Sequence, residues 1–538
     1  MPWTIHPSRY TALYNLYRRY LPCNWSRSET LGCIPADYTI TKARQGNLHR
    51  LGKPPEGPVY ADETADTSQV YNNQLVIYIA QSTTRSYQSR PKAETSSMAN
   101  STPIVIVGAG AFGLSTALHL SRAGYTDITV LDKDDAVPSR YSAANDLNKI
   151  IRAEYEDAFY TELALKAMSA WKTPLFAPYY HQTGFLHCVS ETAPEKAVAT
   201  MQQFRASAEQ DAQLRRELVS IDTRRDILHH VPQFYDGPLP GWRGYLNRCA
   251  GYAQSGHALA AVHRHLCQSG VRFRLGPSNQ VVGIRYEAPS ADSSGAAGRT
   301  ARGVETANGA FYPARLVIVA AGAWAAQLVP QLGSQVEARC WSVAHVQLTD
   351  DEASALRGIP VTYARDLGFF FEPDPGTKLL KLCPMGAGIV NTDGGTGVSL
   401  PPGDLSRGAF LPGDDEGKLR RLLAHTLPAL AERPLVKKYL CWIADTSDSD
   451  YIVDYVPGTR SSVVVLSGDS GHGFKMFPIV GSWVADLLRA ADGRQHEARW
   501  RWKDQKAERS GSHGGNEVSW RVGETRELSS VEPTNPGL

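Results

Sequence analysis

The stretch Thr102-Pro-Ile-Val-Ile-Val-Gly-Ala-Gly-Ala-Phe-Gly113 decides the fold class of this chain. Its apolar run, residues 104–107, predicts a strand buried in a parallel sheet. Three glycines follow, and each has a physical task. Gly108 makes a tight turn, Gly110 lets the backbone approach a pyrophosphate, and Gly113 lets a helix pack closely on the strand.

A helix, a second strand and an acid complete this unit. The helix is expected over residues 114–123, and its N-terminal N–H groups would face the phosphates. The strand Ile128–Leu131 follows, and Asp132 at its end, 24 residues after Gly108, can accept ribose hydroxyls. The order indicates a dinucleotide-binding βαβ unit, with a glycine-rich turn that binds no ligand as the weaker alternative. The unit alone does not separate FAD from NAD.

Two later segments repeat the sequence of a strand followed by small residues. Residues 316–324 run from an apolar strand into Ala-Ala-Gly-Ala-Trp, and residues 463–475 from another strand into Ser-Gly-Asp-Ser-Gly-His-Gly-Phe-Lys. A helix is expected over residues 478–490, with its N-terminus toward a polar group of the ligand. A dinucleotide domain assembled from such distant segments suits a flavoprotein better than a simple NAD dehydrogenase.

Composition excludes several classes of protein. The 538 residues are 42% apolar and 20% charged, with a net charge of +2, which gives no sign of a nucleic-acid partner. The eight cysteines are scattered, without Cys-x-x-Cys or His-Glu-x-x-His, which argues against structural zinc and a disulfide scaffold, and we expect no metal. The apolar, glycine- and alanine-rich stretch at residues 317–329 is too short to span a membrane, and residues 1–30 lack a secretory signal. We expect an intracellular soluble protein.

The domain prediction follows from the dispersed strands. Residues 1–97 are expected to be a poorly structured extension, a transit-like segment or a gene-model artefact, because Met98 lies just before the first strand. The tail after residue 495 is polar and expected to fray. The predicted parts are the extension at 1–97, an FAD-binding domain at 98–155, 240–335 and 440–495, a substrate domain at 156–239 and 336–439, and the tail at 496–538.

Cys441 stands beside a tryptophan in the segment Tyr439-Leu-Cys-Trp-Ile-Ala-Asp-Thr-Ser-Asp-Ser-Asp-Tyr451, far from any other cysteine. By itself it fits a buried apolar residue, a metal ligand, a nucleophile or a cofactor attachment point.

Six motifs, in order along the chain, carry a family resemblance. The sequence resembles the fungal fructosyl amino acid oxidases (amadoriases), which belong to the sarcosine oxidase group of FAD-dependent amine oxidases. The similarity spans about residues 100–503. It implies an α/β fold in which a Rossmann-type FAD-binding domain, built from discontinuous segments, accompanies an α+β substrate domain on a mixed or antiparallel sheet. The motifs are Gly108–Gly113, Asn145–Arg152, Gly244–Gly251, Gly368–Pro373, Cys441–Thr446 and Ser470–Lys475.

The resemblance assigns roles to single residues. It implies that Cys441 carries the flavin through a thioether to its 8α carbon. It places Lys149 near the flavin ring, Lys381 over the flavin for the reaction with oxygen, and Arg152 and Lys475 against a substrate carboxylate. Taken singly, these lysines also fit ordinary surface positions. His472 is expected to be structural or near the flavin. The full predicted cofactor set is Gly108, Gly110, Ala111, Phe112, Gly113, Asp132, Lys133, Asn145, Lys149, Cys441, Gly471, Gly473, Phe474 and Lys475.

One position departs from the family pattern. The resemblance implies a glutamate at this position in amadoriases and a histidine in sarcosine oxidases, but this chain has Met385. Methionine makes no useful hydrogen bond to a sugar hydroxyl and forms an adaptable apolar wall, to which Ile443 adds. We therefore expect a bulkier secondary or N-methyl amine, of the kind met in alkaloid or other secondary metabolism.

The expected reaction gives an imine, with O2 reduced to H2O2. A fructosyl amino acid oxidase, a pipecolate or saccharopine oxidase, a non-enzymatic flavin-binding scaffold and an NAD dehydrogenase are the alternatives. Besides the amine and O2 we expect no nucleic-acid or membrane partner, and a monomer. The chain ends Asn-Pro-Gly-Leu, which is no peroxisomal signal, so a cytoplasmic location is expected.

Overall fold

The glycine turn lies in the middle of a largely parallel sheet. In the computed structural model, which describes residues 98–287, 298–503, 521 and 523–531, strand β1 (Ile104–Val107) lies between β2 (Ile128–Asp132) and β13 (Leu316–Val319). The strands predicted at these three places are confirmed. The order β20-β21-β13-β1-β2-β9 is completed by β9 (Arg272–Leu275), β21 (Val463–Ser467) and antiparallel β20 (Ile452–Tyr455).

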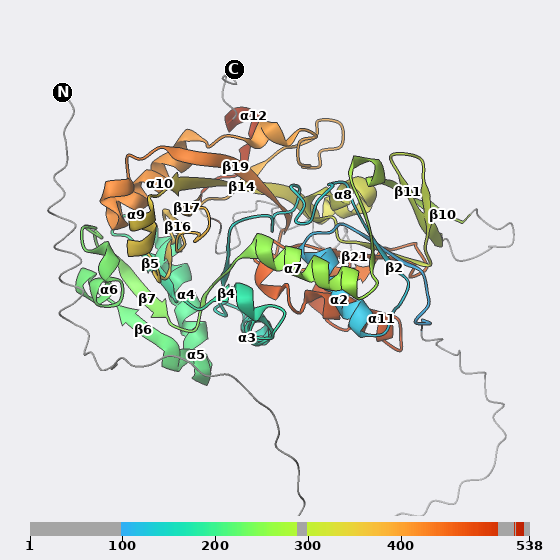
Figure 1. Ribbon diagram of the computed structural model, residues 1–538, viewed down its shortest axis with the longest axis horizontal. Helices are drawn as coiled ribbons and strands as arrows, with labels where there is room; N and C mark the ends of the chain where they lie inside the picture. Colours follow the sequence, from blue (N-terminus) through green and yellow to red (C-terminus); the bar gives the residue numbers. More distant parts are fainter. Residues whose placement is uncertain (1–97, 288–297, 504–520, 522, 532–538) are drawn as a thin grey trace, which may run out of the picture. The chain divides into compact units, whose positions relative to one another are not determined.

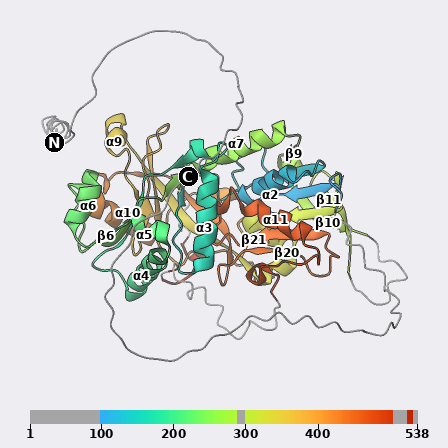
Figure 2. The same ribbon diagram turned by 90° about the horizontal axis from the view of Figure 1, so that it is seen from below.

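Three helices cover this sheet near the glycine turn. They are α2 (Ala111–Arg122), α7 (Ser255–Gln268) and α11 (Val480–Arg489), and Figure 2 shows α2 and α11 side by side. Gly481 permits this contact, because a Cβ there would lie 2.1 Å from the Ser115 carbonyl oxygen. Helix α2 begins three residues earlier than predicted, so Gly113 lies inside its first turn.

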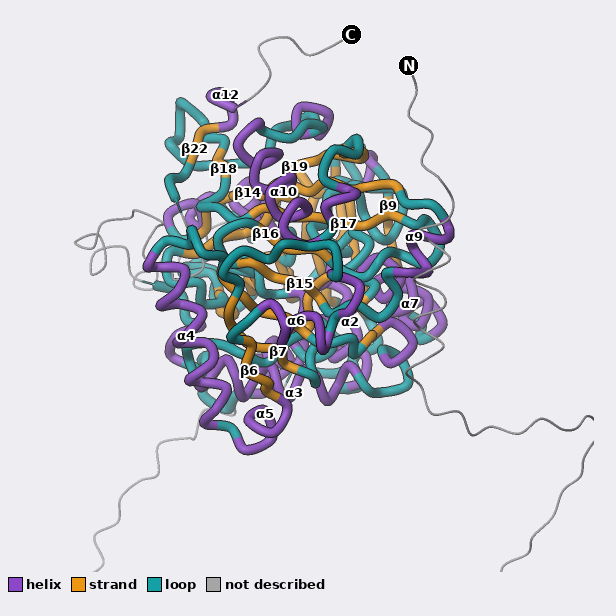
Figure 3. Tube along the Cα trace, turned by 90° about the vertical axis from the view of Figure 1, so that its left-hand side faces the viewer, coloured by secondary structure: helices purple, strands orange, loops and turns teal. Residues whose placement is uncertain are grey.

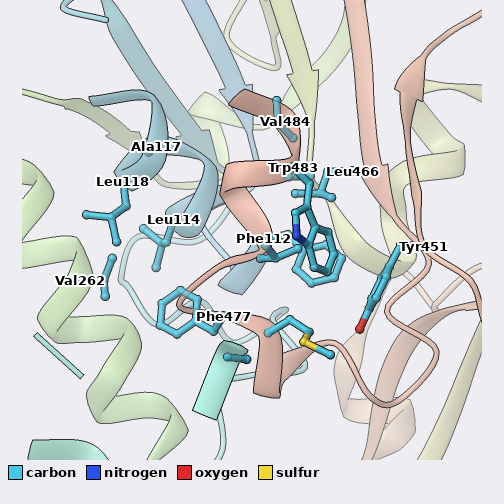
Figure 4. Packing of buried hydrophobic residues seen from close by; sticks show 14 of the residues in the cluster. Phe112, Leu114, Ala117, Leu118, Val262, Tyr451, Leu466, Phe477, Trp483 and Val484 are labelled. Carbon is cyan, nitrogen blue, oxygen red and sulfur yellow. The ribbon is translucent and has the colours of Figure 1, made fainter. Parts of the chain in front are cut away.

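An apolar cluster fills the space beside these helices. Phe112 of α2, Trp483 of α11 and Tyr451 lie together in it (Figure 4). The ring centres of Phe112 and Tyr451 are 6.1 Å apart, and those of Tyr451 and Trp483 are 5.0 Å apart. Rings of this size account for much of the apolar area that a core removes from water.

A larger mixed sheet forms the rest of the framework. The long strands β14 (Val336–Gln347) and β19 (Leu435–Thr446) pair antiparallel and run side by side in Figure 1. Pairs β5–β15 and β18–β22 are parallel, so the mixed sheet expected for the second part of the fold is confirmed. Its other strands are β5 (Phe185–Val189), β6 (Leu218–Ile221), β7 (Arg243–Asn247), β15 (Val361–Ala364), β16 (Gly368–Phe370), β17 (Leu379–Pro384), β18 (Ile389–Val390) and β22 (Arg526–Glu527).

Smaller elements complete the described fold. One small sheet joins β3 (Lys149–Ile151), β8 (Gly251–Ala253) and β4 (Tyr180–His181), and another joins β10 (Val281–Tyr286), β11 (Ala301–Thr306) and β12 (Phe311–Pro313). None of the helices described is both long and apolar enough to cross a membrane. The remaining α-helices are α3 (Ala158–Trp171), α4 (Glu195–Gln210), α5 (Ala212–Glu217), α6 (Arg224–His230), α8 (Ala325–Leu328), α9 (Asp350–Ala355), α10 (Gly413–Thr426) and α12 (Leu528–Val531).

Two strands pair in a different sheet from the one that the expected domain boundaries imply. Strands β7 and β19 belong to the larger sheet, although the sequence prediction places residues 240–335 and 440–495 in the FAD-binding part. The prediction for residues 1–97 lies outside the described residues.

The expectation of a frayed tail is wrong for the parts of it that the structure describes. The indole of Trp500 lies 4.3 Å from that of Trp483, centre to centre. Strand β22 pairs with β18 at the edge of the larger sheet (Figure 3), and Leu528 is fully buried. The polar composition concealed these few apolar and strand residues, which long-range packing holds in place.

Candidate active site

Two of the three glycines, Gly108 and Gly113, stand where any side chain would collide with the backbone. A Cβ on Gly108 would lie 2.5 Å from the Ala320 carbonyl oxygen, and Gly108 has a φ of +108°, which favours glycine. A Cβ on Gly113 would lie 1.8 Å from the Gly108 carbonyl oxygen. Gly110 caps α2 without a side-chain hydrogen bond. The first N–H groups of α2 therefore remain available for an anion.

Asp132 supports this turn from the end of β2. Its Oδ2 accepts a hydrogen bond from the Ala109 N–H at 2.7 Å, and Oδ1 accepts one from the Asp134 N–H at 2.9 Å. Burial raises the pKa of Asp132. The carboxylate thus fixes the glycine turn and also lines the adjoining cavity.

A cavity of about 370 Å³ opens next to the glycine turn. Strands of the parallel sheet contribute their ends to its wall, and Trp442 and Ile443 of β19 contribute from the larger sheet. Of the predicted cofactor residues, the cavity is lined by Gly108, Gly110, Ala111, Phe112, Asp132, Lys133, Lys149, Gly471, Gly473 and Phe474.

Lys133 lines the cavity between two aromatic side chains. Its Nζ lies 3.9 Å from the ring centre of Tyr141 and 4.2 Å from that of Trp324. Burial lowers the pKa of Lys133 to about 8. Asn145, by contrast, is exposed and donates from Nδ2 to the Pro138 carbonyl oxygen at 3.3 Å, so the structure does not bring it into the cavity wall.

Cys441 lies beside the cavity on β19. Its Sγ is 4.0 Å from the Nζ of Lys149 and 3.7 Å from the carbonyl oxygen of Ala143, and both of these residues line the cavity. Burial raises the pKa of the Cys441 thiol, while the Lys149 ammonium acts in the opposite direction. The thiol and the predicted ring-side cation are thus neighbours.

Asp146 is the main residue of the site that the sequence did not single out. Its Oδ2 accepts hydrogen bonds from the Nζ of Lys149 at 2.8 Å and from the Nζ of Lys381. Burial alone would raise the pKa of Asp146, but the two ammonium groups hold it well below its usual range. The same carboxylate raises the pKa of Lys149 against the effect of burial. The carboxylate joins Lys149 and Lys381, the two lysines predicted to lie at the flavin ring, into one cluster.

Asp469 is a second acid that was missed. It lines the cavity, and its oxygens accept from the N–H groups of Ala444 at 2.9 Å and Gly471 at 3.2 Å. Burial raises the pKa of Asp469 to about 6. Its place after strand β21, beside predicted cavity residues, was the available signal.

Lys475 and His472 form a buried hydrogen-bonded group with two tyrosines. The Nζ of Lys475 donates to the Tyr155 hydroxyl at 2.7 Å, and that hydroxyl lies 3.0 Å from His472 Nδ1, as does the Tyr451 hydroxyl. His472 Nε2 lies 2.9 Å from the carbonyl oxygen of Ser449, which can only accept, so Nε2 carries the proton. Burial lowers the pKa of His472 to about 3 and that of Lys475 well below its usual value. His472 therefore positions Tyr155 beside Lys475.

Arg152 lies near this group, and Met385 lies apart from the cavity wall. The Arg152 guanidinium is 5.5 Å from the Tyr155 ring centre and 4.7 Å from that of Phe204. Met385 is buried in an apolar cluster that also holds Phe371. The Phe371 ring centre is 4.9 Å from the Nζ of Lys381, which connects the apolar cluster to the lysines.

Comparisons with known proteins agree with this geometry. The family model for FAD-dependent oxidoreductases (DAO) matches residues 103–487. The L-saccharopine oxidase of Schizosaccharomyces pombe is 33% identical over 435 residues, covering 78% of this chain and 95% of that protein. An amino acid oxidase of Aspergillus flavus is 30% identical over 453 residues, covering 72% and 93%.

Solved structures give the same result. The crystal structure of the fructosamine oxidase Amadoriase II from Aspergillus fumigatus superposes with a TM-score of 0.72 at 30% identity, covering 82% of this chain and 99% of that one. The resemblance to amadoriases is confirmed. The matched region includes the glycine turn, the cavity, Cys441 and the lysine cluster, and the chain belongs to the DAO family of FAD-dependent oxidoreductases.

Proposed function

We propose that this enzyme oxidises the C–N bond of a carboxylate-bearing secondary or N-methyl amine to an imine, with O2 reduced to H2O2. A bound flavin would supply the redox chemistry, namely the acceptance of a hydride from the carbon next to nitrogen and the two-electron reduction of O2. The nitrogen lone pair forms the new C=N bond and the nitrogen proton is released, so that O2 gains two electrons and two protons in all.

The observation that carries the proposal is that one cavity meets the needs of a flavin dinucleotide at both of its ends. Gly108 and Gly110 line the cavity without a side chain, where a pyrophosphate would lie against the backbone, and Asp132 offers oxygen acceptors to the ribose. Cys441 lies on a strand of the larger sheet with Lys149 beside it, and we expect the flavin ring there. The residues present fit the group.

Cys441 supports a covalent link to the flavin. The nucleophile is a thiolate, and a neighbouring ammonium stabilises it; the Lys149 Nζ at 4.0 Å supplies that charge. We expect the yellow colour of the purified enzyme to remain in an acid-precipitated, washed pellet. Cys441→Ala should release it. Cys340→Ala is the matched control, since Cys340 is a buried cysteine paired with Trp442 on the adjacent strand, and should retain it. Colour that washes out of the unaltered enzyme would contradict the link.

The cations of the site have separate tasks in this mechanism. Arg152 and Lys475 hold the substrate carboxylate, and the arriving negative charge favours the protonated form of the Lys475 Nζ, which burial otherwise disfavours. Lys381, held by Asp146, presents its charge for the reduction of O2. Tyr155 and His472 keep the Lys475 Nζ in place.

The nature of the amine distinguishes the candidate substrates. The apolar cluster that holds Met385 reaches Lys381 through Phe371, and this supports a bulkier amine of secondary metabolism. The structural similarity to Amadoriase II supports a fructosyl amino acid as a second candidate, and the relative in Schizosaccharomyces pombe supports a saccharopine-type or pipecolate-type acid.

Anaerobic reduction separates these substrates. Each amine is mixed with the purified enzyme without oxygen, and bleaching of the flavin absorbance is followed; H2O2 release is then measured in air. The proposal requires that a secondary or N-methyl amine bleach the flavin faster than fructosyl valine. Bleaching by no amine at all would overturn it. We also propose a cytoplasmic monomer, which sedimentation and localisation of a fluorescent fusion would test.

A further inference from the structure

Arg365 is a buried arginine whose guanidinium has no carboxylate partner among the described residues. It follows strand β15, and its backbone N–H donates to the Cys188 carbonyl oxygen at 2.9 Å. The residue is 0% exposed. Its Nε and Nη2 have no hydrogen-bond partner, and its Nη1 lies 3.5 Å from His187 Nε2. Arginine is almost never fully buried unless it is paired.

The two other buried arginines of the described chain behave differently. Arg339 and Arg521 both form ion pairs with Asp445. An isolated buried charge is costly because nothing replaces the water that it loses. This protein therefore pairs its buried guanidinium groups elsewhere, and Arg365 is the exception in the described part.

Among the described residues no carboxylate lies within ion-pair distance of Arg365; the rings of Phe204 and Tyr363 lie 4.8 Å and 5.9 Å from its guanidinium carbon, and Glu156 raises its pKa only from farther away. Burial lowers the pKa of His187 well below its usual value, so the imidazole is neutral. A second cation shares an aromatic neighbour with Arg365: the guanidinium carbons of Arg152 and Arg365 lie 4.7 Å and 4.8 Å from the ring centre of Phe204. Glu154, two residues after Arg152, is also fully buried, and both of its carboxylate oxygens lack a hydrogen-bond partner.

The position of this pair relates it to the active site. Arg152 comes directly after β3, whose first residue, Lys149, lines the cavity. Arg152 also lies against Tyr155, which holds Lys475. Lys475, Arg152 and Arg365 thus form a series of cations. It begins at the proposed binding place of the substrate carboxylate, and Phe204 lies against its last two members.

We infer that Arg365 binds a second carboxylate of the substrate, so that the enzyme acts on a secondary amine with two acidic groups. This inference rests on the proposed function and narrows its substrate class. A guanidinium fork with two unpartnered donor nitrogens suits a carboxylate, which accepts two parallel hydrogen bonds. Phe204 contacts both guanidinium groups and would contact the carbon chain between the two acids.

The test compares two substrates that share their reacting end. N-methyl-L-glutamate and N-methyl-L-glutamine have the same methylamine and α-carboxylate, and differ only in the charge of the far group. We expect the unaltered enzyme to favour the glutamate by on the order of 10- to 100-fold in kcat/KM. Arg365→Met should remove this preference by lowering kcat/KM for the glutamate alone, and Arg365→Lys should retain part of it.

The control removes a cation from α4 at the surface. Arg205 follows Phe204 on this helix, is partly exposed and pairs with Glu209 at 2.7 Å, so Arg205→Gln should leave the preference unchanged. A lack of preference in the unaltered enzyme, or an equal loss for both substrates in Arg365→Met, would overturn the inference while the amine oxidase proposal stands.

A binding measurement covers the case in which neither substrate is oxidised or the variant folds poorly. The melting temperature of the unaltered enzyme is measured with dicarboxylates from malonate to adipate and with the monoamide of each acid. A rise that occurs with the diacids, peaks at one chain length and is absent with the monoamides supports two fixed carboxylate sites. Equal responses to diacids and monoamides contradict them.

Discussion

Replacing Asp146 with asparagine tests the centre of the proposed active site. The side chain of Asp146 is 1% exposed and accepts from both Lys149 and Lys381. Asparagine at this position would keep the shape of the side chain and one acceptor oxygen but remove the charge. Two ammonium groups would then remain in the interior without a counter-ion.

The structure sets the size of the expected effect. Removing one partner of a buried ion pair costs about 3–5 kcal/mol, because the other charge stays buried and unpaired. The Lys149 side chain is 23% exposed, so solvent relieves part of this cost and we expect the lower value, about 3 kcal/mol. With roughly 2 cal/mol/K of unfolding entropy per residue over some 400 folded residues, the melting temperature should fall by roughly 3–5 °C.

The pH dependence follows from the depressed pKa of Asp146. A carboxylate with a lowered pKa in the folded protein stabilises it above its unfolded pKa of about 3.9, and this contribution is lost as the pH falls toward the folded value. The difference between the unaltered enzyme and Asp146→Asn should therefore be constant from about pH 6 to pH 8 and shrink below about pH 4. Thermal unfolding of samples with equal flavin content, recorded across this range, measures it.

A surface pair provides the matched control. Asp486 is 66% exposed and pairs with Arg489 at 2.7 Å, so Asp486→Asn should change stability by less than about 1 kcal/mol. If Asp146→Asn and Asp486→Asn have the same melting temperature, the Asp146 carboxylate does not stabilise the two buried lysines. The double variant Asp146→Asn, Lys381→Met should recover part of the loss, because one unpaired cation is gone.

Three further predictions concern the flavin, oxygen and the C-terminal segment. Gly113→Ala puts a methyl group 1.8 Å from the Gly108 carbonyl oxygen, so the protein should be purified with little flavin; more than half of the normal absorbance per chain would contradict this. Lys381→Met should slow reoxidation on the order of 100-fold and leave anaerobic reduction nearly unchanged, as stopped-flow spectra will show; equal slowing of both steps would remove its oxygen-specific role. Trp500→Ala should lower the free energy of unfolding by about 3 kcal/mol in denaturant titrations, because its ring packs 4.3 Å from that of Trp483; a change under about 1 kcal/mol would mean that this contact is dispensable.

Local patterns predicted the parts of the fold that local interactions determine. The strand, turn, helix and acid from Ile104 to Asp132 depend on neighbours within one βαβ unit, and the structure has each of them. Cys441 was distinguished only by its resemblance to a family motif, because its contacts with Ala143 and Lys149 span 298 and 292 residues.

Long-range contacts account for what sequence reasoning missed. Asp146 stood inside a quoted motif, yet its importance comes from Lys381, 235 residues away. Arg365 gave no signal, because a single arginine in a loop looks like a surface residue until its burial is known. Strand β22 has two residues, too few for any periodic pattern, and exists because the edge of β18 is available for pairing.

The order of strands in the parallel sheet has a consequence for synthesis on the ribosome. Strand β1 emerges early, but its neighbour β13 and the next strand β21 follow only much later in the chain. The hydrogen bond between the His119 ring and the Pro478 carbonyl oxygen joins residues 359 positions apart. The ribosome needs roughly 20–70 s to translate this length at ~5–20 residues per second. During that time one apolar edge of the nascent sheet stays unpaired, so a chaperone that covers such edges should determine the yield of this enzyme in a foreign host.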